Sequence, residues 1–79
     1  MYKVTYVQMY YNNRLMTMTS DIAKTINECL RRKIRICLII DIVHNRIWDV
    51  TDDTEEAERV VRKLQREEPS DAKYCFDVV

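Results

Sequence analysis

The sequence predicts one small α+β domain with the element order ββαββαβ and a mostly antiparallel sheet. In the segments predicted to be strands, apolar residues occur at every second position. In the two segments predicted to be helices, apolar residues recur every three or four positions. The middle of the chain is rich in β-branched residues, which favour strands. We expect both helices to pack on one face of the sheet. The predicted strands are residues 2–11, 14–19, 34–43, 46–50 and a last strand through Tyr74, Phe76 and Val78; the predicted helices are residues 20–32 and 53–67.

The first two strands are predicted to form a hairpin around Asn12-Asn13. Asparagine adopts positive φ more readily than most residues, which suits a two-residue turn between antiparallel strands. Such a turn fixes the register as Tyr11 with Arg14, Tyr10 with Leu15, Met9 with Met16, Gln8 with Thr17, Val7 with Met18 and Tyr6 with Thr19. The better core face is Val7, Met9, Met16 and Met18, and the other face shows Tyr6, Gln8, Tyr10 and Thr17.

Each predicted helix begins at a residue able to cap it. Ser20 can accept from the first free amides of the first helix, and Asp21 suits the positive end of the helix dipole. The second helix has two candidate capping pairs, Asp52 with Glu55 and Asp53 with Glu56. A loop at Pro69-Ser70-Asp71 precedes the last strand.

The segment from Ile34 to Val43 is the most hydrophobic part of the chain and is predicted to be the central strand. A strand that is apolar on both faces needs cover on both. We therefore expect a partner or a second copy to cover one side. One face carries Ile36, Leu38, Ile40 and Ile42, and the other, about half apolar, carries Arg35, Cys37, Ile39, Asp41 and Val43.

The turn at His44-Asn45 leaves two registers open for the next strand. A two-residue loop places Ile47 on the face of the even-numbered isoleucines but brings Asp49 with it. A three-residue loop with a bulge places Trp48 and Val50 there instead. We favour the bulge because it buries the only tryptophan.

At 79 residues, the chain is predicted to be one domain, residues 1–79. A shift of 32 residues aligns residues 13–21 with residues 45–53, and four of the nine positions are identical. Two explanations stand: an internal ββα repeat, residues 2–32 and 34–67, or chance, because both segments obey the same rules for turns and helix starts.

The composition is that of an ordinary globular protein, 47% hydrophobic and 33% charged. The longest uninterrupted apolar run, Ile36 to Ile40, is too short to cross a bilayer, and the N-terminus lacks the apolar block of a signal peptide. Cys29, Cys37 and Cys75 are widely spaced on apolar stripes, as expected of reduced core cysteines. We predict a cytoplasmic protein with no membrane segment, metal site or cofactor.

Catalysis has little support in the sequence. His44 is the only imidazole, and Asp41 is its nearest candidate partner, but a histidine at a hairpin tip is usually solvated. The chain contains no glycine, so it has no glycine-rich phosphate loop. The carboxylates of residues 52–56 match no EF-hand spacing and suit a helix N-terminus. We predict no enzyme and no catalytic residue.

The formal net charge is zero, but its sign changes along the chain. Residues 1–48 carry eight basic and three acidic side chains, net +5, whereas residues 49–79 carry five basic and ten acidic ones, net −5. Zero net charge and an acidic second helix weaken long-range attraction for phosphates. A small nucleic-acid-binding regulator is the alternative function, and its binding residues would be Arg31, Arg32, Lys33 and Arg35.

The surplus of apolar and aromatic surface favours a non-enzymatic protein-protein interaction module. We expect the protein partner to be bound by Tyr6, Tyr10, Leu15, Ile39 and Val43. A homodimer joined through sheet faces or through an edge strand would cover the same surfaces. In size and element order alone, the chain resembles small phage-encoded inhibitors, including anti-CRISPR proteins. The resemblance implies an inhibitor or regulatory subunit that occludes the surface of a host complex.

Overall fold

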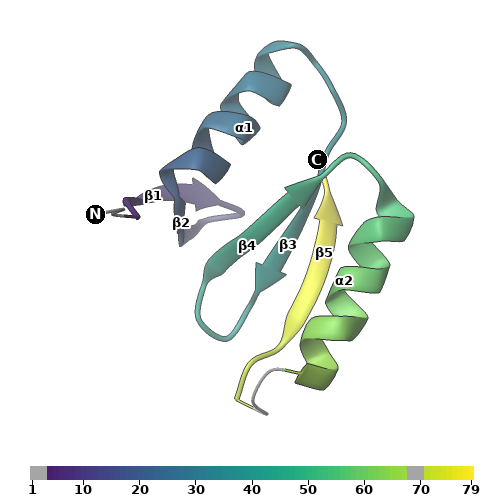
Figure 1. Ribbon diagram of the computed structural model, residues 1–79. Coiled ribbons are helices and arrows are strands. Elements are labelled where there is room, and N and C mark those ends of the chain that lie inside the picture. The colour runs from purple at the N-terminus through teal and green to yellow at the C-terminus, as the bar shows by residue number, and fades with distance from the viewer. Residues whose placement is uncertain (1–3, 68–70) are drawn as a thin grey trace.

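The computed structural model describes residues 4–67 and 71–79, which form one five-stranded sheet and two helices (Figure 1). The elements are β1 (Tyr6–Tyr11), β2 (Arg14–Thr19), α1 (Ser20–Arg31), β3 (Cys37–Asp41), β4 (Arg46–Thr51), α2 (Thr54–Glu67) and β5 (Tyr74–Val78). The strand order is β1-β2-β4-β3-β5, and only β2 and β4 are parallel neighbours. The predicted element order and mostly antiparallel sheet are confirmed. Tyr2, Lys3, Pro69 and Ser70, which the predictions included, lie outside the described residues.

The hairpin of β1 and β2 follows from its two-residue turn. Asn12 and Asn13 have φ of 49° and 63°, the left-handed conformation that a turn matching the twist of antiparallel strands requires. All six predicted pairs are present, from Tyr11 with Arg14 to Tyr6 with Thr19. The hairpin register is therefore confirmed.

The helix starts differ in detail from the prediction. Thr19, rather than Ser20, caps α1, because its Oγ1 accepts from the amide of Ile22 at 3.3 Å. At α2, Oδ1 of Asp53 accepts from the amide of Glu55 at 2.9 Å, so of the two acids it is Asp53 that meets a free helix amide.

The exit from α1 shows how the chain ends a helix without glycine. Lys33 takes the left-handed conformation, with φ of 59°, and the amide of Ile34 donates to the carbonyl of Cys29 at 2.9 Å. This hydrogen bond is the one expected at a helix C-terminus that is closed by a residue in the left-handed conformation. A residue with a Cβ pays roughly 1–2 kcal/mol for that conformation.

The two helices lie on opposite faces of the sheet, which corrects the prediction that both pack on one face. Ala23 and Ile26 of α1 share a core with Leu38 and Ile40, whereas Ala57 of α2 packs with Cys37 and Ile39. Successive strand residues point to opposite faces, so the helices are on opposite sides, as Figure 1 shows. A half-turn about a line between parallel β2 and β4 would exchange the two ββα units, and this operation also exchanges the faces.

The central strand is shorter than predicted but buried on both sides. β3 covers Cys37–Asp41 rather than residues 34–43, and all five of its residues are buried. Beyond its N-terminal end, Ile36 exchanges backbone hydrogen bonds with Val79, at 3.3 and 2.9 Å. A single chain thus supplies the cover for both faces of β3.

The register of β4 matches neither predicted solution. Asp41 pairs with Arg46, which leaves a four-residue loop, and a bulge follows opposite Ile39 and Ile40. Ile47 pairs with Ile40 and lies on the α1 side of the sheet, and because the bulge adds one residue to β4, Val50 lies on that side too, while Trp48 packs on the α2 side. A bulge is present, as favoured, but it does not place Trp48 with the even-numbered isoleucines.

Ile39 tests the cover that α2 gives to β3. Ile39→Ala is expected to lower the free energy of unfolding by about 2–5 kcal/mol, because the side chain is 1% exposed and its removal leaves a cavity. Val43→Ala, at a site that is 53% exposed, is expected to change it by less than about 0.5 kcal/mol. Urea denaturation of both variants measures the difference. Equal, small effects would mean that α2 does not cover β3.

Candidate functional site

An open surface remains on the β1–β2 hairpin because α2 covers only part of its face of the sheet. Among the described residues, α2 contacts β3, β4 and β5 but neither strand of the hairpin. The side chains left open are 62% exposed at Tyr6, 75% at Tyr10 and 42% at Leu15. Tyr10 and Leu15 are direct cross-strand neighbours, so their apolar surfaces adjoin. We call this surface the hairpin face and define it as Tyr6, Gln8, Tyr10, Leu15, Thr17 and Thr19.

The other two predicted partner-binding residues do not join the hairpin face. Ile39 is 1% exposed in the core beneath α2, so its predicted role in partner binding is wrong. Its burial comes from tertiary cover, which residue alternation does not report. Val43 is 53% exposed, but it lies in the loop between β3 and β4.

A cation and an aromatic ring of β4 border the hairpin face, and a buried tyrosine of β5 packs behind them. The guanidinium of Arg46 lies 4.5 Å from the centre of the Trp48 ring, and Trp48 meets Tyr74 edge to face with centroids 6.0 Å apart. Arg46 is the β4 residue paired with Thr17, so this stack adjoins the hairpin face. Sequence reasoning missed it because the β2–β4 pairing joins residues far apart in the chain.

The fully buried carboxylate of Asp41 closes the loop between β3 and β4. Its Oδ1 accepts from the amides of Val43 and His44 at 3.1 and 3.3 Å, and its Oδ2 lies 2.7 Å from His44 Nδ1 and 3.6 Å from Arg46 Nη2. Burial by itself raises the pKa of Asp41, but the hydrogen bonds from His44 and Val43 outweigh it and hold the pKa below its ordinary value of 3.8. His44 is therefore bonded to Asp41, rather than simply solvated as predicted. These hydrogen bonds within the loop give Asp41 a structural role.

The predicted nucleic-acid residues lie at the far end of α1 from the hairpin. Two of the four pair locally: Arg31 bonds to Glu28, and Arg32 Nε lies 2.9 Å from the same carboxylate. A helix of 12 residues is about 18 Å long. The basic cluster at the C-terminal end of α1 is therefore about that far from the N-terminal end of α1, which follows β2 directly. The structure does not bring the basic cluster and the exposed tyrosines together.

A second basic stripe lies on α2, whose acidic residues are concentrated at its N-terminal end. One of its cations, Arg62, is paired with Glu58 at 2.6 Å. The stripe and the cluster at the end of α1 belong to helices on opposite faces of the sheet, so they do not form one basic surface. The stripe consists of Arg59, Arg62, Lys63 and Arg66.

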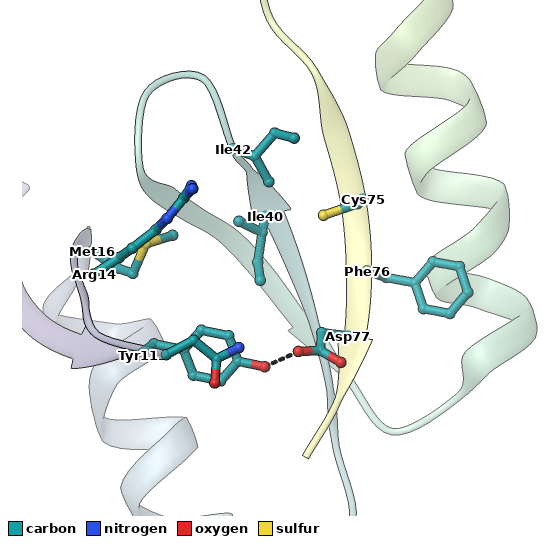
Figure 2. Close-up of a pocket in the computed structure, with 9 residues that line it drawn as sticks. Tyr11, Arg14, Met16, Ile40, Ile42, Cys75, Phe76 and Asp77 are labelled. Atoms are coloured by element: carbon teal, nitrogen blue, oxygen red, sulfur yellow. Dashed lines mark hydrogen bonds between the residues drawn. The ribbon is translucent and has the colours of Figure 1, made fainter.

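Figure 2 shows a cleft between the tip of the hairpin and β5. Met16 and Ile40 lie within it, and the Tyr11 hydroxyl donates to the Asp77 carboxylate, which links the two edge strands of the sheet. Burial and the neighbouring Asp77 raise the pKa of Tyr11 to about 12. The cleft holds about 240 Å³, below the roughly 300–1,000 Å³ of typical small-molecule sites. We therefore treat it as a structural junction.

No protein-family model, no curated protein and no solved structure matches this chain. In the described parts of the chain, no three or more His, Cys, Asp or Glu residues gather in a way that could hold a metal ion. Over residues 4–67 and 71–79, no helix has the length and apolar character needed to cross a bilayer. Cys29, Cys37 and Cys75 are free thiols. The candidate site is therefore the hairpin face, which rests on the exposure of its own side chains.

Asp41 makes the stability of the protein depend on pH. Because its pKa is lowered on folding, its stabilising effect is present above pH 3.8 and is lost as the pH falls through the folded-state pKa. Asp41→Asn is expected to cost about 1–3 kcal/mol at pH 7 and progressively less in acid. Urea denaturation at pH 7 and pH 3 measures the gap in the free energy of unfolding between wild type and Asp41→Asn. Asp52→Asn, at an exposed site, is the control, and a gap for Asp41→Asn that stays constant with pH would contradict the assignment.

Tyr11 gives the opposite pH dependence. Its pKa is raised on folding, so its stabilising effect is present below pH 10.0 and is lost as the pH rises toward 12. Tyr11→Phe removes the bond to Asp77 and is expected to cost about 0.5–1.5 kcal/mol at pH 7. Urea denaturation should show this cost for Tyr11→Phe and none for Tyr10→Phe, whose ring is 75% exposed. Equal stability of wild type and Tyr11→Phe at pH 7 would show that the bond contributes nothing.

Proposed function

We propose that this protein is a non-enzymatic interaction module that docks a folded partner protein on its hairpin face. The observation that carries the proposal is the exposure of Tyr6, Tyr10 and Leu15 on one side of a hairpin whose other side is held in the core. Tyrosine supplies a large contact area at a low cost in side-chain entropy, and aromatic residues are enriched where interfaces gain their energy.

The chemistry of the hairpin face favours an uncharged, apolar partner surface. None of its six residues is charged, so a partner can be desolvated there without leaving an ion unpaired. A phosphate backbone would instead need several cations beside the rings. The protein acts as a cytoplasmic inhibitor or regulatory subunit in this proposal, because covering a partner's surface needs no chemistry from the chain.

The hairpin face is tested by removing its tyrosine rings. Tyr6→Ala/Tyr10→Ala is expected to raise the Kd for the partner at least tenfold, a loss of about 1.4 kcal/mol. Stability should change little, because both rings are largely exposed. Partners captured by wild-type protein are purified, and their binding to each variant is measured by isothermal titration calorimetry.

Leu30→Ala is the matched control, because Leu30 is 55% exposed but lies on α1. It should bind like wild type. A partner that binds the tyrosine variant and wild type equally would contradict docking on the hairpin face. Fluorescence anisotropy with single-stranded and duplex oligonucleotides checks the alternative: tight binding that weakens steeply with salt would show a nucleic-acid-binding protein.

A further inference from the structure

The outer edge of β1 carries backbone groups that the hairpin leaves unpaired. In a hairpin closed by a two-residue turn, the residues flanking the turn form a hydrogen-bonded pair, and such pairs recur at every second position. Tyr11, Met9 and Val7 therefore bond to β2. The amides and carbonyls that point away from β2 are those of Tyr6, Gln8 and Tyr10.

The opposite unit of the fold shows how such an edge is satisfied. β1 and β3 hold corresponding places in the sheet, because each lies on the outer side of one strand of the parallel β2–β4 pair. β5 pairs antiparallel with the outer edge of β3, and the amide of Ile42 donates to the carbonyl of Lys73 at 3.0 Å. The described chain supplies a fifth strand for the β3 edge and none for the β1 edge.

The β1 edge also lacks the features that prevent strand pairing. Proteins protect exposed edges with charged residues, proline, bulges or very short strands. β1 is six residues long, pairs with β2 without a break in register and has the sequence YVQMYY, which has neither a charge nor a proline. The whole chain has zero formal net charge, so two copies do not repel each other at long range.

We propose that two copies of this chain join by antiparallel pairing of their β1 strands, with Gln8 on the two-fold axis. A two-fold axis perpendicular to the sheet keeps each face on its own side, so every β1 residue must pair with one of the same parity. Centring the axis on Gln8 pairs Tyr6 with the partner's Tyr10. It also makes all the outward-pointing groups of Tyr6, Gln8 and Tyr10 bond across the axis.

The resulting assembly is closed and extends the hairpin face. Each copy uses its one β1 edge, so the contact stops at two chains and does not propagate into a fibre. Cross-strand aromatic pairs stabilise the junction, with Tyr6 of each copy opposite Tyr10 of the other. The hairpin faces of the two copies lie on the same side of a continuous sheet. Dimerisation itself does not depend on what that surface binds.

The axis position is tested by placing charges at Gln8 in the full-length chain. Sedimentation equilibrium should give wild type a mass of twice 9.6 kDa. Gln8→Lys and Gln8→Glu should each raise the dimer dissociation constant at least about tenfold, because like charges face each other across the axis. An equimolar mixture of the two variants should restore the dimer, because position 8 then pairs a lysine with a glutamate.

Two further variants separate the edge from other surfaces. Thr17→Glu puts a charge on the same face one strand inward and should leave the dimer intact. Gln8→Pro removes an outward amide and should give a monomer with unchanged far-UV circular dichroism. The proposal is overturned if wild type stays monomeric in sedimentation equilibrium over a series of protein concentrations, or if species larger than a dimer form. It is also overturned if the Gln8→Lys and Gln8→Glu variants dimerise like wild type, or if mixing them fails to restore the dimer.

Discussion

Two-sided burial of β3 is the constraint on which the rest of the structure depends. Leu38 and Ile40 lie in a core shared with α1, Cys37 and Ile39 lie in a core shared with α2, and all five residues of the strand are buried. A chain of 79 residues is small for a sheet with helices on both faces. Because α2 is occupied in covering β3, β4 and β5, it does not reach the hairpin. The open hairpin face is the consequence of that division.

The hairpin is held to the rest of the sheet by few backbone bonds. β2 and β4 pair at Thr17 and Arg46 alone, supported by the bond from the Thr17 amide to the Asn45 carbonyl at 2.9 Å. Side chains supply most of the remaining attachment, through Met16 and Met18 in the core and Tyr11 at Asp77. A second copy paired along β1 would add backbone bonds on the other side of the hairpin.

Local rules in the sequence predicted what depends on neighbours in the chain. Asn12 and Asn13 define the turn, and the turn defines the register, so local sequence alone places Tyr6, Tyr10 and Leu15 on one face of the hairpin. Ile39 was misassigned because an apolar side chain in a strand looks the same whether a helix or a partner covers it. The link between Tyr11 and Asp77 spans 66 positions and has no local signal.

The side on which each helix lies could not be read from either helix alone. It depends on the parallel pairing of β2 with β4, and one pair of residues sets that arrangement. The bulge at Trp48 had a similar origin, since Asp41 must meet Arg46 while Ile47 and Val50 both reach the core shared with α1. The internal repeat remains a prediction.

The measurement that tests two-sided burial most directly is a nuclear Overhauser experiment on a methyl-labelled sample. Contacts from the Ile39 methyls to Ala57 and Val60 of α2, together with contacts from Leu38 to Ile26 of α1, are the predicted result. Contacts from Ile39 and Leu38 to the same helix, or none from Ile39 to α2, would contradict the account.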